Sequence, residues 1–276
     1  MTDQLFECLP RVACEIQGGA HLLLCLDFDG TLAPIVTNPA NARMPEATRA
    51  VLEALAHRPA TSLAIVSGRA LADLRSRVGV GAVILAGNHG LEIAGAGDGW
   101  RHPEAVQWQP ALAEICRDLR SRTVAIPAAF VEDKGLTASV HYRNVAPSDH
   151  QKLLGLVWGA VAPNLDHFLL RRGRKVLEIL PRVSWDKGSA VLWILERLRE
   201  TGRPDVVVGY VGDDLTDEFA FRKLPGAITI RVGRDSPTAA RFRVRDVAQV
   251  RQFLNWLRDP GLPGFQPEPD RRSLVY

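Results

Sequence analysis

The stretch Leu22-Leu-Leu-Cys-Leu-Asp-Phe-Asp-Gly-Thr-Leu32 decides how the rest of the chain is interpreted. Its apolar half predicts a buried strand over residues 22–26, and this strand ends abruptly at Asp27 and Asp29. Two carboxylates one residue apart repel each other and lose hydration when a fold buries them. A divalent cation between the pair and an anionic substrate would offset that cost, because the ion reverses the local charge balance. Open α/β sheets bind ligands at this place, outside the carboxyl ends of parallel strands.

This segment closely resembles the Asp-x-Asp-Gly-Thr signature of the haloacid dehalogenase superfamily. The resemblance implies that Asp27 attacks phosphorus and forms an aspartyl-phosphate. It also implies that Asp29 protonates the leaving oxygen and then deprotonates the water that releases phosphate. An Asp-rich turn is the alternative for a bare Asp-x-Asp, but the apolar strand before the pair and the Gly-Thr after it argue against that alternative.

Ser67 and Lys187 lie at the ends of predicted elements of the same α/β pattern. Ser67 comes just after a strand predicted over residues 61–66, and its hydroxyl can donate to a phosphoryl oxygen or cap the next helix. Lys187 opens a predicted helix and can neutralise phosphate and nucleophile together, although a solvated lysine gives the same pattern. Both residues are therefore candidate catalytic groups.

A cluster of four acids within six residues follows the strand predicted over residues 205–211. Asp213, Asp214 and Asp217 can all face one ion, whereas Asp217 and Glu218 also suit the first turn of the next helix. With the earlier residues, this cluster completes all four superfamily motifs in order. The implied cofactor is Mg²⁺, which prefers carboxylates, a carbonyl, waters and phosphate. The resemblance implies direct ligation by the Asp27 carboxylate, the Asp29 backbone carbonyl and Asp213, with Asp214 and Asp217 acting through water or orienting the site.

Strands and helices alternate over most of the chain, which predicts an α/β fold with a doubly wound, Rossmann-like parallel sheet covered on both faces. We expect further core strands at 82–86 and 227–232, a hairpin over 91–100, and helices at 45–57, from 70, at 186–200, near 219 and at 247–257. Helix–strand–strand units recur between 107 and 180, with helices at 110–122 and 148–162 and strands at 130–134, 136–142, 165–170 and 175–180. We expect an inserted α+β cap over 107–180, a core formed by 1–106 and 181–276, and a loose tail over 259–276.

Composition excludes several classes of protein. The chain has 276 residues, of which 46% are hydrophobic and 24% charged, as in ordinary soluble enzymes. The formal charge of +3 is scattered, so we expect no nucleic-acid partner, and no apolar stretch is long enough to span a membrane. The four cysteines show no metal-binding spacing, and the first residues lack a signal-peptide pattern, so we expect a cytoplasmic protein. The oligomeric state is left open, with a slight preference for a monomer.

The surrounding sequence, from about residue 22 to 255, resembles the trehalose-6-phosphate phosphatase family. The segments that carry this resemblance are residues 27–35, 87–92, 131–135, 141–143, 175–178 and 212–218. Phe28 replaces the Tyr or Leu that is usual between the two aspartates, at a position whose side chain does no chemistry. The resemblance implies that the inserted domain closes over the core and recognises a disaccharide.

Mixed polar residues in and beside the expected cap are candidates for that recognition. We expect substrate contacts from Asn88, His89, Glu132, Lys134, His141, Arg143 and Glu178. Glu178 interrupts an apolar strand, while Glu132 with Lys134, and His141 with Arg143, fall two residues apart on one strand face. Sugar hydroxyls need both donors and acceptors, which this mixture supplies. The alternative for the strand residues is an exposed sheet face with salt bridges. The alternative for Asn88 and His89, which follow the third core strand, is an ordinary turn.

The leading hypothesis is a phosphoric monoester hydrolase, a Mg²⁺-dependent phosphatase that converts trehalose 6-phosphate to trehalose and phosphate. A phosphatase of another glycosyl phosphate, such as sucrose phosphate or mannosyl phosphoglycerate, stays open. So do a phosphomutase and a non-catalytic sugar-phosphate sensor, although the intact set of Asp27, Asp29, Lys187 and Asp213 argues against a sensor.

Overall fold

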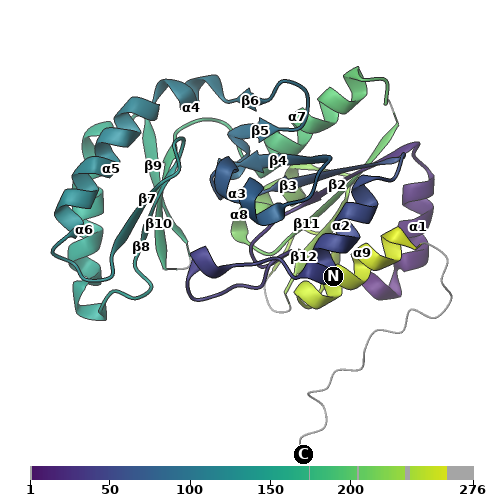
Figure 1. Cartoon of the computed structure of the whole chain (residues 1–276), viewed down its shortest axis with the longest axis horizontal. Helices are drawn as coiled ribbons and strands as arrows, with labels where there is room; N and C mark the ends of the chain where they lie inside the picture. The colour runs from purple at the N-terminus through teal and green to yellow at the C-terminus, as the bar shows by residue number, and fades with distance from the viewer. Residues whose placement is uncertain (1, 174, 204, 234–236, 260–276) are drawn as a thin grey trace, which may run out of the picture.

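The structure, a computed structural model, describes residues 2–173, 175–203, 205–233 and 237–259, which form two β-sheets with flanking helices (Figure 1). The larger sheet has the strand order β1-β13-β12-β11-β2-β3-β4-β5-β6. Its strands are β1 (Asp3–Gln4), β2 (His21–Leu26), β3 (Thr61–Val66), β4 (Val83–Gly87), β5 (Glu92–Ala94), β6 (Trp100–Arg101), β11 (Val206–Gly212), β12 (Ile228–Val232) and β13 (Phe242–Val244). The strands from β1 to β4 pair in parallel, and the expected hairpin β5–β6 adds two antiparallel strands at one edge.

Alternation along β2 explains why helices cover both faces of this sheet. All six residues of β2 are buried. Leu22, Leu24 and Leu26 pack into one apolar cluster, whereas Leu23 and Cys25 pack into the other, as the two-residue period of a strand requires. The first cluster is completed by α1 (Leu9–Gln17), α2 (Glu46–Ala56), α3 (Leu71–Val78) and α9 (Val247–Arg258), and the second by α7 (Lys187–Glu200) and α8 (Leu215–Lys223). The predicted α/β class and two-sided cover are confirmed.

The smaller sheet is antiparallel, with the strand order β7-β8-β10-β9. Its strands are β7 (Phe130–Asp133), β8 (Ala138–His141), β9 (Phe168–Gly173) and β10 (Val176–Pro181). The helices α5 (Gln109–Thr123) and α6 (His150–Val161) cover one of its faces, at the left of Figure 1. Its other face looks toward the larger sheet, and the short helix α4 (Pro103–Gln107) leads into it. The boundaries of an inserted cap at 107–180 stay a prediction.

The structure corrects several expected elements. The pattern did not predict α1, α4, β1 or β13. The strand expected at 165–170 is β9, which begins at Phe168 because the 3₁₀ turn Ala162–Asn164 is followed by a further turn over 165–167. Pro45 precedes α2 as its N-terminal cap instead of lying in its first turn. Of the expected tail, residues 260–276 lie outside the described part of the chain.

Within the described residues, no helix has the length and apolar character that crossing a membrane requires. The expected cytoplasmic location and the expected lack of nucleic-acid partners stay predictions.

Candidate active site

Three aspartates meet at the carboxyl edge of the larger sheet. Asp27 directly follows β2 and Asp213 directly follows β11, and these two strands are neighbours in the sheet. Asp217 lies in the first turn of α8, and each of the three residues places a carboxylate oxygen within 4.8 Å of the others. Asp27 and Asp217 are buried. Sequence positions almost 190 residues apart thus form one acidic cluster.

Lys187 is the cation that faces this cluster. Its Nζ donates to Asp27 Oδ1 at 2.7 Å and to Asp217 Oδ1 at 2.8 Å. Asp186 caps α7 by accepting from the Ser189 N–H at 2.8 Å, and this cap fixes where Lys187 leaves the helix. Burial disfavours the ammonium form, but the carboxylates of Asp217 and Asp27 outweigh it and raise the pKa of Lys187.

One lysine does not balance the charge of the cluster. Burial raises the pKa of Asp27, and the charges of Asp217 and Asp213 raise it further against the opposing effect of Lys187. Burial, with the charges of Asp217 and Asp214, raises the pKa of Asp213 to about 7. Asp213 Oδ1 is buried and has no hydrogen-bond partner within the described part of the chain. An oxygen-rich, negatively charged pocket with an orphaned carboxylate oxygen fits a hard divalent cation.

The other acids of the motif have different surroundings. Asp217 also accepts from the Tyr210 hydroxyl at 2.7 Å and, through Oδ2, from the Asp214 N–H at 2.9 Å. The Asp214 side chain is exposed and accepts from the Leu215 N–H at 2.6 Å, so it caps α8. Glu218 is buried and accepts from Arg231 at 3.4 Å and from the Ala239 N–H at 2.8 Å.

Two glycines allow the carboxylates to approach the backbone this closely. Gly30 has φ +83°, and a Cβ built there would lie 2.1 Å from Asp213 Oδ2. At Gly212 a Cβ would lie 2.2 Å from Asp217 Cγ. Both distances are far inside van der Waals contact, so a side chain at either position displaces an acidic residue of the cluster.

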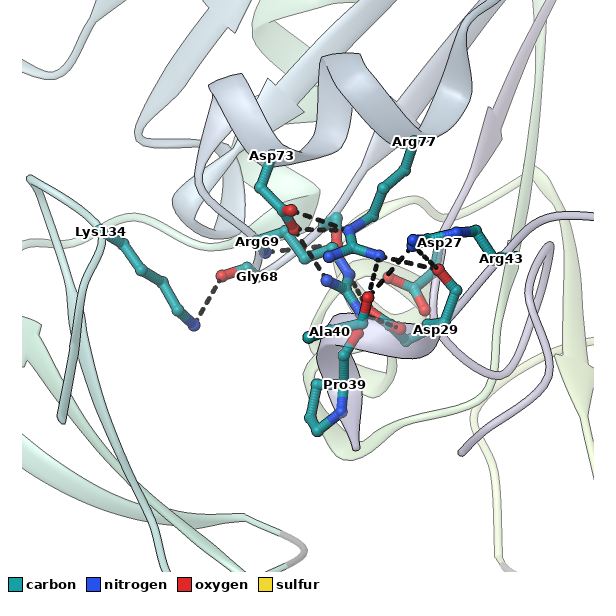
Figure 2. A network of polar contacts seen from close by, with 12 residues as sticks. Asp27, Asp29, Pro39, Ala40, Arg43, Gly68, Arg69, Asp73, Arg77 and Lys134 are labelled. Atoms are coloured by element: carbon teal, nitrogen blue, oxygen red, sulfur yellow. Dashed lines mark hydrogen bonds and ion pairs between the residues drawn. The ribbon is translucent and has the colours of Figure 1, made fainter. Parts of the chain in front are cut away.

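Asp29, the expected acid and base, is held by a residue that the sequence did not single out (Figure 2). Arg69 Nε donates to Asp29 Oδ2 at 2.6 Å, and Arg69 Nη2 donates to Asp29 Oδ1 at 2.7 Å. Ser67 is buried just after β3, and its Oγ accepts from the Arg69 N–H at 3.3 Å. Ser67 therefore does not cap α3, whose N-terminal cap is Ala70 with no side-chain hydrogen bond.

Several expected sugar-binding residues bind one another, within the smaller sheet or across to the larger unit. His141 Nε2 lies 2.8 Å from Glu132 Oε2. Glu178 Oε1 lies 3.2 Å from His89 Nε2, and its Oε2 accepts from Arg171 Nε at 2.9 Å. Burial raises the pKa of Glu178, but His89 and Arg171 outweigh burial and leave this pKa below its ordinary range.

Two of these residues join the smaller sheet to the larger one. Lys134 Nζ donates to the Gly68 carbonyl at 3.1 Å (Figure 2). Asn88 is fully buried, donates to Glu92 Oε1 at 2.6 Å and to the Lys134 carbonyl at 3.0 Å, and accepts from Thr137 at 2.5 Å. Arg143 is exposed in the turn after β8.

A cavity of about 290 Å³ lies between the two sheets beside Lys187. The smaller sheet contributes Leu169 and Arg171, and the larger unit contributes His89, Trp185, Phe219 and Lys223. The lining combines charged and polar side chains with apolar ones, which suits a small polar ligand with apolar ring faces.

Comparisons with known proteins identify the family of this chain. The family model described as trehalose-phosphatase matches residues 25–248. The chain belongs to the trehalose-phosphatase family. It is 38% identical to the trehalose-phosphate phosphatase of Mycolicibacterium paratuberculosis, over 93% of this chain and 68% of that protein. It is 36% identical to trehalose-phosphate phosphatase B of Arabidopsis thaliana, over 87% of this chain and 67% of that protein.

Solved structures show the same fold. A trehalose-6-phosphate phosphatase related protein matches with a TM-score of 0.74 and 25% identity, over 86% of this chain and 96% of its own. The C-terminal domain of the C. albicans trehalose-6-phosphate phosphatase matches with a TM-score of 0.75 and 23% identity, over 94% and 98% of the two chains. Family membership confirms the enzyme class expected from the sequence, a phosphoric monoester hydrolase.

In this member of the trehalose-phosphatase family, sequence reasoning missed Arg69, Arg171 and Tyr210. Arg171 could have been found from register, because it pairs directly with Glu178 across β9 and β10. Tyr210 lies in a buried strand, where its hydroxyl needs a polar partner. Arg69 gave no such signal, since its partner Asp29 lies 40 residues earlier in the chain.

Proposed function

We propose that the chain hydrolyses trehalose 6-phosphate to trehalose and phosphate, with Mg²⁺ as cofactor and an aspartyl-phosphate on Asp27. The names of the relatives support the substrate. The observation that carries the chemistry is the cluster of Asp27, Asp213 and Asp217 around Lys187 at the carboxyl edge of the sheet. A phosphoryl group is transferred mainly by positioning and charge balance, which this cluster is built to supply.

The residues that would hold Mg²⁺ are the Asp27 carboxylate, the Asp29 backbone carbonyl and Asp213. The orphaned Asp213 Oδ1 supports this choice. Asp217 already accepts from Lys187, Tyr210 and the Asp214 backbone, so we assign it to orienting the site. Asp214 caps α8, which leaves it a water-mediated role. When bound, the ion supplies positive charge against the carboxylates and the substrate phosphate.

The chain's own residues would act in two steps. Lys187 holds Asp27 Oδ1 and so orients the carboxylate for attack on phosphorus. The Asp27–phosphorus bond forms as the bond from phosphorus to the sugar oxygen breaks, and Asp29 gives its proton to that oxygen. Asp29 then takes a proton from water, whose oxygen attacks phosphorus and releases phosphate from Asp27. Ser67 and Lys187 balance charge on the phosphoryl oxygens.

We further propose that residues 107–180 form a cap that closes over the core and recognises the sugar. His89, Glu132, Lys134, His141, Arg143 and Glu178 are the proposed sugar contacts. Three of them, His89, Lys134 and Glu178, take part in polar contacts between the smaller sheet and the larger unit. The Asn88 side-chain amide already makes hydrogen bonds to Glu92, Lys134 and Thr137. We therefore propose that Asn88 stabilises the β7–β8 turn and does not contact the sugar. In this proposal the substrate is a small molecule, a phosphorylated disaccharide.

The test is phosphate release from a panel of sugar phosphates, measured with Mg²⁺ and with a chelator. We expect release from trehalose 6-phosphate, a large loss with the chelator, and no release by Asp27→Asn. Preferred release from sucrose phosphate or mannosyl phosphoglycerate would assign the chain another glycosyl phosphate. Thermal stabilisation by the substrate without release would indicate a sensor, and an isomeric sugar phosphate as product would indicate a phosphomutase.

A further inference from the structure

A chain of charged contacts runs beside the acidic cluster, from Asp29 through Arg69 and Asp73 to Arg77 (Figure 2). Arg69 Nη1 donates to Asp73 Oδ2 at 2.7 Å, and Arg77 Nε donates to Asp73 at 2.8 Å. We infer that Arg69 is a positioning residue that fixes the direction of the Asp29 carboxyl group for proton transfer to the sugar oxygen. This inference rests on the proposed function, because it assigns Asp29 that proton transfer.

The contact between Arg69 and Asp29 has the geometry that fixes a carboxylate. Two parallel N–H···O bonds of 2.6 and 2.7 Å join the guanidinium to both carboxylate oxygens. Such a fork restricts rotation about the carboxyl group, which a single hydrogen bond does not. A carboxylate has about four lone-pair sites, so the fork leaves one on each oxygen for a substrate. The Asp29 side chain is 40% exposed, so a substrate can reach the carboxylate oxygens from the side that does not face Arg69.

Arg69 is itself fixed on every side, which separates this pair from an ordinary surface salt bridge. Its side chain is 11% exposed. Besides Asp29 and Asp73, it donates to the Pro39 carbonyl at 2.9 Å, and its Cζ lies 5.4 Å from the centre of the Phe28 ring. Surface ion pairs contribute little because both side chains move freely. Here the Arg69 guanidinium is held in place by its other contacts, so it determines the position of the Asp29 carboxylate.

The competing explanation is structural. Arg77 also donates to the carbonyls of Ala40 and Ala42, at 3.2 and 2.8 Å, so the same chain of contacts ties the loop after Asn38 to α3. If Arg69 only maintains this loop, its removal lowers every activity of the site together. If Arg69 positions the proton donor, its removal matters most where the leaving group needs a proton.

Two substrates separate these explanations. The sugar oxygen of trehalose 6-phosphate is a poor leaving group that needs a proton, whereas 4-nitrophenolate leaves from 4-nitrophenyl phosphate without one. We expect Arg69→Gln to lower kcat/KM for trehalose 6-phosphate by roughly ten- to a hundredfold, the size of one charge-assisted contact. The loss for 4-nitrophenyl phosphate should stay below about threefold. Arg69→Lys keeps the charge but not the fork, so we expect it to restore only part of the activity.

Arg241→Gln is the matched control, because Arg241 makes a similar fork to Glu15, at 2.6 and 2.8 Å, on α1. We expect this variant to keep both activities. Equal losses on both substrates for Arg69→Gln would overturn the inference, since a structural or phosphate-binding role predicts them. No release of phosphate from trehalose 6-phosphate by the unmodified chain would overturn the proposed function instead.

A double-mutant cycle gives a second, independent outcome. If Arg69 acts only through Asp29, adding Arg69→Gln to Asp29→Asn should cost less than about twofold further on trehalose 6-phosphate. Additive losses would overturn the inference. If Arg69→Gln does not fold, as judged from its circular dichroism and thermal unfolding, Asp73→Asn takes its place. That variant loosens Arg69 without touching Asp29, and it should show the same selective loss at smaller size.

Discussion

The two polar regions of the molecule balance charge in different ways. At the edge of the larger sheet, Asp27 and Asp217 share Lys187, and the neighbouring Asp213 has one oxygen without a hydrogen-bond partner among the described residues. On the smaller sheet, Glu132 pairs with His141, and Glu178 pairs with Arg171 and with His89 of the larger unit. The first region lacks positive charge and needs it from outside. The second is satisfied internally, so any ligand there has to replace contacts that already exist.

Removing the proposed nucleophile should have the largest effect. We expect Asp27→Asn to lower kcat for trehalose 6-phosphate by about 10⁴-fold or more, because an amide is a very poor nucleophile toward phosphorus. Burial raises the pKa of Asp27, so an uncharged side chain suits this position and the melting temperature should not fall. Phosphate release and thermal unfolding measure the two effects. Activity near that of the unmodified chain would exclude the aspartyl-phosphate.

Charge removal at Asp213 should expose the dependence of the first region on a cation. Saturating Mg²⁺, at about a hundred times its Kd, should raise the melting temperature of the unmodified chain by roughly 5 to 10 °C. Asp213→Asn should shrink that shift and require more Mg²⁺ for half-maximal activity. In the metal-free state it should be at least as stable, since burial raises the pKa of Asp213 to about 7. Glu53→Gln, an exposed acid on α2, is the control, and an equal Mg²⁺ shift in both variants removes Asp213 from the ligands.

Neutralising Glu178 should test the second region. Glu178→Gln weakens the contacts to His89 and Arg171. It also removes a carboxylate that we propose as an acceptor for a sugar hydroxyl. We expect kcat/KM for trehalose 6-phosphate to fall by roughly ten- to a hundredfold, and that for 4-nitrophenyl phosphate to change little. Glu114→Gln on the outer helix α5 should alter neither value. Equal losses on both substrates would mean that Glu178 serves the fold or the chemistry instead of the sugar.

The smallest effect on catalysis is expected at Asn88, where stability should change instead. Asn88→Ala leaves Thr137 and the Lys134 carbonyl without this partner, which should cost about 1 to 3 kcal/mol. The melting temperature should then fall by roughly 2 to 10 °C. Denaturant unfolding beside Asn41→Ala, an exposed position, measures the difference. A stable variant that no longer discriminates sugars would return Asn88 to the substrate contacts.

The parts of the fold that the sequence predicts well are those with strong periodicity. The strand at Thr61–Val66 and the helices at Lys187–Glu200 and Val247–Arg258 match the expectations within a residue. The elements α4 and β13 have only five and three residues, too few for a period to show. The acidic cluster was predictable because its members follow neighbouring strands, and strand ends meet at one edge of a parallel sheet.

The hydrogen-bond partners of a side chain were predictable only where both residues lie at a fixed spacing in the sequence. Asn88 suited a turn or a binding rim, and the structure shows a buried connector, because its partners Lys134 and Thr137 come from another sheet. Ser67 does not cap α3, because its Oγ accepts from the N–H of Arg69, which precedes that helix. Such choices depend on how the two sheets are placed, which no local pattern contains.

The closeness of Gly30 and Gly212 to the carboxylates also limits how this sequence can vary. A methyl group at either position would overlap Asp213 or Asp217, so even alanine is excluded without moving the residues beside it. In a saturation-mutagenesis library selected for phosphate release, both positions should therefore accept glycine alone. Exposed glycines such as Gly81, where an added Cβ would meet no atom within 4 Å, should accept most residues. At these two positions the requirement for glycine comes from the acidic residues themselves, because the atoms that an added methyl group would meet belong to Asp213 and Asp217.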